Sequence, residues 1–193
     1  MSTTDGQRPL SPPWGFPMSG WGGVLSAFKS YLEGAAMAAR QAARAEVTVE
    51  ASPEEAFALF TEDIGLWWRR DTPYWNDRER GRSVRIEPGV GGRFVEVYDL
   101  ETGSGMEVGR VTAWEPGRRL ALTWTQIGWP QGASTELEIT FEPAAEGGTT
   151  VRLEHTGFER VPGAIDFIAG YDAGWKEVLG WFAEHANARA SGH

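Results

Sequence analysis

The sequence contains no cysteine and only three histidines among its 193 residues. Without cysteine the chain can form no disulfide and carries no thiolate that could act as a nucleophile or a metal ligand. Three histidines are also few for a multi-histidine metal site, because zinc sites are built mainly from histidine and cysteine. We therefore exclude a structural zinc site and expect neither a bound metal nor another cofactor.

Basic side chains are scarce as well. The 18 lysines and arginines face 27 aspartates and glutamates, which gives a formal net charge of -9 and a pI of about 4.9. Binding to a phosphate backbone requires clustered lysine and arginine side chains that release counterions. The charge balance therefore argues against a nucleic-acid partner.

The sequence also lacks a long hydrophobic run. No uncharged stretch approaches the roughly 20 apolar residues of a membrane-spanning helix, and the first residues do not combine the basic and apolar segments of a secretory signal. At 41% hydrophobic residues, the chain can nevertheless bury the core of one ordinary domain. These features lead us to expect a cytoplasmic protein without a membrane span.

What the sequence does contain is a succession of alternating segments. Two of them place apolar side chains, or a histidine, at every second position: Leu137, Ile139, Phe141, Val151, Leu153 and His155. A period of two is typical of an antiparallel sheet with one covered face. Together with glycine-containing turns, the pattern predicts strands at about 46–51, 82–88, 93–100, 105–114, 118–126, 134–142 and 149–156.

Two helices are predicted around these strands. Ser52 as N-cap, Pro53 at the first helical position and Glu55 as the capping-box partner predict a helix that ends before Gly65. A second helix, residues 167–185, carries a bulky stripe at three- and four-residue steps: Phe167, Tyr171, Trp175, Val178 and Phe182. A curved sheet against one long helix tends to leave a cavity between them, so the order of elements predicts an α+β fold with a small-molecule pocket.

The first 44 residues have a different composition. Residues 1–23 form a proline-rich arm that carries Trp14, Phe16 and Trp21, and residues 24–44 predict an alanine-rich amphipathic helix. This N-terminal extension (residues 1–44) would cap the pocket of its own domain, cross to a partner in a homodimer, or lie on a membrane surface. The first two are preferred, because membrane binding favours a more cationic helix face. We expect a folded domain at residues 45–187 and a short tail at residues 188–193.

Six short motifs occur in one order along the domain. They are Ala51–Phe57 (ASPEEAF), Gly91–Phe94 (GGRF), Gly109–Thr112 (GRVT) leading to Glu115-Pro116, Arg119–Trp124 (RLALTW), Gly148-Thr149 before Val151–His155 (VRLEH), and Gly174-Trp175. Together they resemble the START-like helix-grip superfamily known as SRPBCC, and more closely its AHSA-like branch, related to the activator of the heat-shock chaperone ATPase. The resemblance covers roughly residues 46–186.

The resemblance implies a helix-grip fold, in which a curved antiparallel sheet of about seven strands surrounds a long C-terminal helix. Most members hold apolar or aromatic ligands in the groove under that helix, whereas others bind a chaperone or cyclise polyketides. Because the superfamily has no universal catalytic motif, the resemblance assigns no catalytic residue.

The preferred function is therefore the binding of a small apolar, aromatic molecule. The expected ligand-binding residues are Leu122, Trp124, Leu137, Ile139, Phe141, Leu153 and His155 on the sheet, Phe167, Tyr171 and Trp175 on the helix, and Trp68 and Trp75 near the mouth. Trp67, Trp68, Tyr74 and Trp75 would form either an aromatic lid over the cavity or ordinary packing under a long loop.

His155 admits two interpretations. It would be a general base in the cavity, or a buried histidine bonded to a backbone carbonyl or a tryptophan N–H. We prefer the second, because no other histidine or inward carboxylate pairs with it. A cyclase- or hydrolase-like enzyme that uses His155, and a chaperone-binding module, remain the alternative functions.

Overall fold

In the computed structural model, the described residues are 29, 31 and 41–191. The chain divides after Arg40 into two compact units, and the second unit contains the sheet and the helices discussed below. Lys29 and Tyr31 of the first unit are helical and exposed. The predicted proline-rich arm, most of the predicted alanine-rich helix and the last two residues lie outside the described residues.

Seven strands form one antiparallel sheet in the order β1-β7-β6-β5-β4-β3-β2. The strands are β1 (Ala43–Val49), β2 (Ser83–Ile86), β3 (Arg93–Val97), β4 (Gly105–Glu115), β5 (Arg119–Trp124), β6 (Thr135–Pro143) and β7 (Thr149–Thr156). All seven predicted strands are present. The predicted end of the alanine-rich helix at Arg44 is wrong, because Ala43 and Arg44 already belong to β1 and pair with His155 and Glu154 of β7.

Two irregularities in strand pairing contribute to the curvature of the sheet. The register shifts between Phe94 and Val95 where β3 meets β4, and between Val111 and Ala113 where β4 meets β5. Such bulges bend a strand and increase its twist. Gly109 lies between them in β4, and a Cβ atom there would lie 1.7 Å from the carbonyl oxygen of Thr123, so the close approach of the strands requires glycine.

The connection between β1 and β2 contains two short helices, as expected: α2 (Pro53–Thr61) and α3 (Ile64–Trp67). The predicted cap of α2 is confirmed, since Ser52 Oγ accepts a hydrogen bond from the backbone N–H of Glu55 at 3.3 Å. Two 3-10 turns, η1 (Phe158–Arg160) and η2 (Ala164–Phe167), lead into the long helix α4 (Ile168–Ala190). This helix continues beyond the predicted end at His185.

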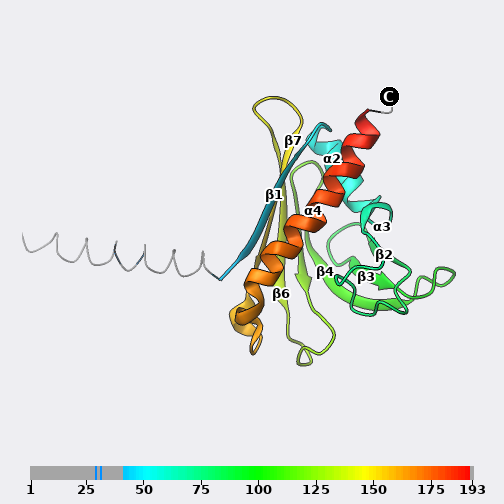
Figure 1. Ribbon diagram of the computed structural model, residues 1–193, viewed down its shortest axis with the longest axis vertical. Coiled ribbons are helices and arrows are strands. Elements are labelled where there is room, and N and C mark those ends of the chain that lie inside the picture. Colours follow the sequence, from blue (N-terminus) through cyan, green and yellow to red (C-terminus); the bar gives the residue numbers. More distant parts are fainter. Residues whose placement is uncertain (1–28, 30, 32–40, 192–193) are drawn as a thin grey trace, which may run out of the picture. The chain divides into compact units, whose positions relative to one another are not determined.

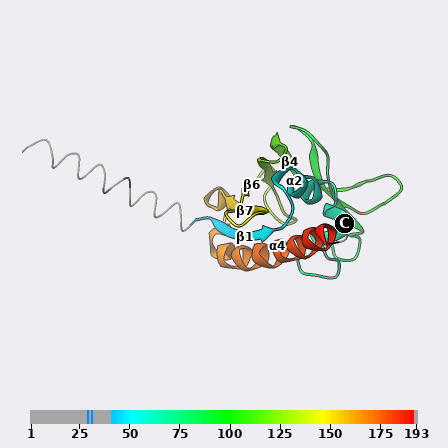
Figure 2. The ribbon, with the colours of Figure 1, turned by 90° about the horizontal axis from the view of Figure 1, so that it is seen from above.

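The last turns of α4 are held by the short connection between α2 and α3. Asp63 Oδ2 lies 2.8 Å from His185 Nε2 and 3.1 Å from Arg189 Nη2. Figures 1 and 2 show α4 along one face of the sheet beside β1, with α2 and α3 near its C-terminal half. The architecture is the α+β helix-grip fold that the sequence predicts.

Aromatic side chains of the core gather where α2 and α3 meet β6 and the C-terminal half of α4. Aromatic rings make edge contacts there, with centroid separations of 5.3 Å for Phe57 and Phe141 and 5.1 Å for Phe60 and Phe182. Within residues 29, 31 and 41–191, no helix combines the length and the apolar composition needed to span a membrane.

Candidate ligand-binding site

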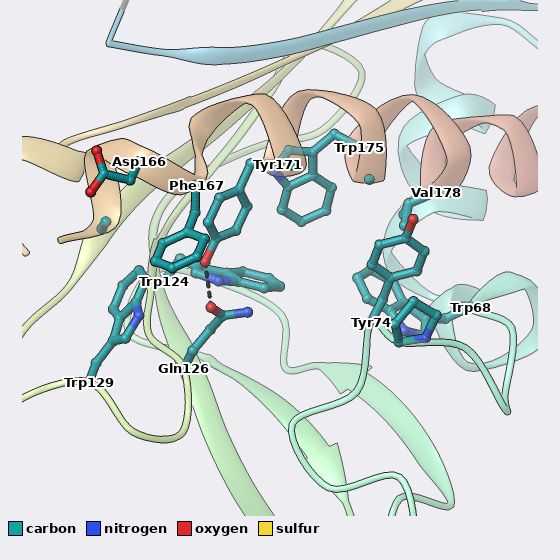
Figure 3. A pocket seen from close by; sticks show the side chains of 14 residues that line it. Trp68, Tyr74, Trp124, Gln126, Trp129, Asp166, Phe167, Tyr171, Trp175 and Val178 are labelled. Carbon is teal, nitrogen blue, oxygen red and sulfur yellow. Dashed lines mark hydrogen bonds between the residues drawn. The ribbon is translucent and has the colours of Figure 1, made fainter.

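A cavity of about 450 Å³ lies under the N-terminal half of α4 (Figure 3). Its volume falls within the range of roughly 300–1,000 Å³ that is typical of small-molecule pockets. It is lined by Trp68, Pro73, Tyr74, Trp124, Gln126, Trp129, Ala164, Asp166, Phe167, Gly170, Tyr171, Gly174, Trp175 and Val178. Seven of these side chains are aromatic, so the cavity suits a flat apolar molecule.

Two glycines of α4 make room for this cavity. A Cβ atom on Gly170 would have nothing within 4 Å, so this position opens into free space. At Gly174, in contrast, a Cβ atom would lie 2.9 Å from Cε1 of Tyr74. The absence of a side chain at Gly174 therefore lets the Tyr74 ring approach the helix and form one wall of the cavity.

One hydrogen bond crosses the cavity from the helix to the sheet side. Tyr171 of α4 donates through its hydroxyl to Oε1 of Gln126, in the loop after β5, at 2.5 Å (Figure 3). Burial raises the pKa of Tyr171 to about 12, so its hydroxyl keeps its proton at neutral pH. Among the described residues that line the cavity, only Asp166 carries a charge.

Two indoles of the wall have unpartnered N–H groups. Nε1 of Trp68 and Nε1 of Trp124 are buried and have no hydrogen-bond partner in the described part of the chain. The Trp124 indole lies beside the Tyr171 hydroxyl (Figure 3) but does not complete a hydrogen bond to it. Buried N–H groups are normally satisfied in proteins, so each exception calls for an explanation.

The loops that form the mouth are fixed by a buried carboxylate. Glu96 of β3 is 2% exposed and accepts hydrogen bonds from the backbone N–H groups of Asn76 and Asp77 at 2.7 and 2.8 Å. The Asn76 side chain donates to Glu96 at 3.2 Å and accepts from the backbone N–H of Ile127 at 2.9 Å. Asn76 thus joins the loop that carries Tyr74 to the loop that carries Gln126. The sequence signal for this link is an acid within the apolar strand Phe94–Val97.

Five of the residues expected to bind a ligand line this cavity: Trp68, Trp124, Phe167, Tyr171 and Trp175. Sequence reasoning missed Gln126, Trp129, Asp166 and the two helical glycines, because they belong to a loop, a 3-10 turn and positions without side chains. Three of the five predicted residues, the tryptophans, also face the core behind the cavity.

The expectation that the cavity continues along the sheet is wrong. Leu122, Leu137, Ile139 and Leu153 enclose a void of only about 10 Å³, which holds at most one water molecule. The indoles of Trp68, Trp124 and Trp175 separate this void from the open cavity, with centroid distances to Trp175 of 6.3 Å for Trp68 and 5.1 Å for Trp124. The rings fill the space that the strand pattern alone leaves open.

Phe141 and Trp75 also lie away from the cavity. Phe141 packs against the rings of Phe57 and Phe60 under α2. Trp75 is 8% exposed, and its indole N–H donates to the backbone oxygen of Arg69 at 2.8 Å. Both side chains are therefore packing residues, which corrects their expected place in the pocket.

The four aromatic residues after α2 divide between the two expected roles. Trp67 donates to the backbone oxygen of Leu59 at 3.1 Å and, like Trp75, packs in the core. Trp68 and Tyr74 line the cavity. The hydroxyl of Tyr74 donates to Glu177 of α4 at 2.6 Å, and this hydrogen bond raises the pKa of Tyr74 to about 12. Tyr74 therefore attaches its loop to the helix.

His155 is a buried structural histidine. Its Nδ1 accepts a hydrogen bond from the indole N–H of Trp175 at 3.0 Å, which confirms the preferred interpretation from the sequence. Its Nε2 lies 2.6 Å from Oγ1 of Thr135, whose hydroxyl donates onward to a backbone oxygen, so the network assigns the proton to Nε2. Burial lowers the pKa of His155 to about 3. With both nitrogens engaged and no contact with the cavity, His155 does not fit the role of a general base.

No metal site accompanies the cavity. Within the described residues, no cluster of three or more histidine, cysteine, aspartate or glutamate side chains could hold a metal ion. The chemistry available at the site is that of aromatic surfaces, neutral hydrogen-bond donors and one carboxylate at the rim.

The chain is similar to a known protein family. The family model described as "Activator of Hsp90 ATPase homolog 1-like protein" matches residues 50–187. No curated protein is similar enough to the chain to count as a match.

Several solved structures share the fold. Protein MLL2253 from Mesorhizobium loti has 21% sequence identity and a TM-score of 0.54, covering 74% of this chain and 94% of its own. The Aha1 dimer from Colwellia psychrerythraea has 21% identity and a TM-score of 0.53, covering 76% and 96%. The anthrahydroquino-gamma-pyrone synthase Txn09, complexed with a molecule abbreviated SUM, has 30% identity and a TM-score of 0.50, covering 74% and 95%.

Proposed function

Because the chain belongs to the family of Activator of Hsp90 ATPase homolog 1-like proteins, we propose that it binds a small aromatic molecule in the cavity between α4 and the sheet. The observation that supports this most directly is the cavity of about 450 Å³ with its aromatic lining. A flat molecule that enters it would contact the rings of Trp124, Tyr171 and Trp175. Burial of apolar area against such rings supplies most of the binding free energy in pockets of this kind.

The mouth of the cavity favours the same conclusion. Phe167 lines the cavity and is 67% exposed, and Ile165 and Ile127, which adjoin the lining residues Asp166 and Gln126 in the chain, are 47% and 61% exposed. Apolar side chains exposed around an apolar opening are typical of ligand-binding grooves. The likeness to Txn09, a synthase whose named product is a fused aromatic molecule, supports an aromatic ligand for this chain as well.

Gly170 and Gly180 of α4 allow a matched test, because a Cβ atom at either position would have nothing within 4 Å. We would titrate N-phenyl-1-naphthylamine, a neutral dye that fluoresces more strongly in apolar surroundings, into the full-length protein and into two variants. Gly170→Phe places a ring in the cavity, whereas Gly180→Phe places the same ring on α4 outside it, where a Cβ atom also has nothing within 4 Å. Both changes replace a helical glycine by phenylalanine, which by itself favours the helix by a few tenths of a kcal/mol.

We expect the wild-type protein and Gly180→Phe to bind the dye with micromolar affinity and Gly170→Phe to bind it at least about tenfold more weakly. Equal loss in both variants would show that the dye binds elsewhere. An absence of binding to the wild-type protein would contradict the proposal directly.

The family description suggests a second candidate, a protein-interaction module that acts on a chaperone ATPase. The same variants separate the two functions. Chaperone binding through the protein surface should survive Gly170→Phe, whereas binding of an aromatic ligand should not.

A homodimer and a cytoplasmic location remain proposals. The solved Aha1 dimer from Colwellia psychrerythraea supports the first, since it shows that a protein with this fold can dimerise. We propose that the N-terminal extension contributes to such a dimer here.

A further inference from the structure

The cavity contains one polar cluster within its aromatic lining. It consists of the Tyr171 hydroxyl on α4, the Gln126 side-chain amide in the loop after β5, and the indole N–H of Trp124 at the end of β5 (Figure 3). In ligand-binding cavities, a few polar groups among apolar walls usually fix the orientation and identity of the ligand. The hydrogen-bonding state of this cluster therefore indicates what the ligand carries.

One donor of the cluster has no partner. The single acceptor in use is Oε1 of Gln126, which takes the hydrogen bond from Tyr171. Trp124 Nε1 has no partner among the described residues. Trp124 is 6% exposed, and the nitrogen itself is buried. An indole N–H can only donate, so this donor of the cluster is left without an acceptor.

The Tyr171–Gln126 hydrogen bond lies beside the unpartnered N–H. Figure 3 shows the Trp124 indole next to this bond, and its nitrogen is buried. A ligand oxygen placed there would accept from Trp124 and from the Tyr171 hydroxyl together. It would thus replace Gln126 as the acceptor for Tyr171 and supply the missing acceptor for Trp124.

The charges around the cavity further restrict which chemical groups the ligand can carry. Of the described lining residues, none is cationic, and the one charged group, Asp166, is an acid at the rim. A carboxylate or phosphate on the ligand would meet this acid without a positive partner. The acceptor is therefore a neutral oxygen, and the surrounding rings require the molecule that carries it to be flat.

We propose, building on the proposed function, that the ligand is a neutral, flat aromatic ketone or quinone whose carbonyl oxygen accepts hydrogen bonds from Tyr171 and Trp124 in place of Gln126. Tyr171 is then a specificity-determining residue. Its hydroxyl distinguishes a carbonyl-bearing ring system from the plain hydrocarbon of the same shape.

The test uses 9-fluorenone and fluorene, two flat tricyclic molecules of nearly the same shape that differ by one carbonyl group. Their affinities for the full-length protein are measured by isothermal titration calorimetry, and the ratio of the two dissociation constants is the readout. Tyr171→Phe removes only the hydroxyl. Tyr98→Phe is the matched control, because it removes the hydroxyl of a tyrosine that does not line the cavity and whose ring packs under Arg80.

We expect the wild-type protein to prefer 9-fluorenone by about five- to tenfold, the effect of one or two net hydrogen bonds. Tyr171→Phe should remove most of this preference by weakening 9-fluorenone alone, and Tyr98→Phe should preserve it. Gln126→Leu should not weaken 9-fluorenone, because Gln126 competes with the ligand for the Tyr171 hydroxyl.

Three results would overturn the inference. The first is equal affinity of the wild-type protein for the two probes, and the second is an unchanged ratio of the two dissociation constants in Tyr171→Phe. The third is a parallel loss of both affinities in that variant, which would indicate that Tyr171 acts through ring packing alone. If any one of these results occurs while fluorene still binds the wild-type protein and Gly170→Phe still blocks that binding, only the proposed ligand class is wrong. If neither probe binds the wild-type protein, the proposed function fails with it.

Discussion

The indole N–H of Trp175 donates to Nδ1 of His155 at 3.0 Å, and this hydrogen bond joins helix α4 to strand β7 inside the core. The ring of His155 is fully buried, and its other nitrogen meets Thr135. The pair lies directly behind the cavity wall, since Trp175 also lines the cavity. A neutral His155, whose Nδ1 accepts this hydrogen bond, therefore helps to position Trp175 in the cavity wall.

The first prediction concerns pH. Because burial lowers the pKa of His155 to about 3 in the folded protein, against about 6.5 in the unfolded chain, the unfolded state binds one more proton between these values. The stabilising contribution is fully present above about pH 6.5 and is lost as the pH falls towards 3. Between pH 6 and 5, this residue should lower the free energy of unfolding by up to about 1.4 kcal/mol per pH unit. Urea denaturation of the wild type and of His155→Phe checks this, because the variant should lack that slope, and equal slopes would contradict it.

The second prediction separates the core from the cavity. Leu153 is 2% exposed and closely packed, whereas Phe167 is 67% exposed. Leu153→Ala should therefore lower the free energy of unfolding by about 2–5 kcal/mol, and Phe167→Ala should change it by less than about 0.5 kcal/mol. For dye binding we expect the opposite order, with Phe167→Ala weakening it and any folded fraction of Leu153→Ala retaining it. Chemical denaturation and dye titration on the same samples provide the comparison.

The third prediction concerns the link between the two mouth loops. Glu96 accepts three hydrogen bonds from Asn76 and Asp77 in a buried position. Glu96→Gln removes the charge and replaces one accepting oxygen by a donor, so it should cost about 2–4 kcal/mol of unfolding free energy. Hydrogen exchange should also accelerate at Ile127, whose N–H is held by Asn76. The exposed Glu146 in the β6–β7 turn offers the control Glu146→Gln, and a similar response of both variants would refute a specific role for Glu96.

The fourth prediction concerns the N-terminal extension. A deletion for this purpose should end at Arg40, because Ala43 and Arg44 pair with β7 and the backbone N–H of Arg44 donates to Asp172 at 2.6 Å. If the aromatic rings of the extension are buried, deletion of residues 1–40 should lower the unfolding midpoint and increase dye binding, since burial contributes about 25 cal/mol per Å². If the extension is exchanged between the subunits of a homodimer, its deletion should also halve the mass measured in solution. An unchanged midpoint, mass and dye response would show that the extension has neither role.

The sequence by itself determined the fold. Alternation in the segments that became β6 and β7 sets which side chains face the helix, and the capping residues Ser52 and Glu55 set where α2 begins. These signals are local, because the period of two and the first turn of a helix are fixed by neighbouring residues. The order of such elements along the chain left few ways to build the sheet. The boundaries of individual elements differ from those predicted, since β1 starts earlier and α4 ends later.

The position of the cavity was decided only by the tertiary structure. The strand pattern identifies Leu137, Ile139 and Leu153 as inward residues, but not whether the space before them is empty. That depends on the indoles of Trp68, Trp124 and Trp175, which come from three separate segments and together close the core at one end. In the same way, the Tyr171–Gln126 and Glu96–Asn76 contacts join residues 45 and 20 positions apart. A cavity is the volume that packed side chains leave unfilled, and packing is a property of residues brought together by the whole fold.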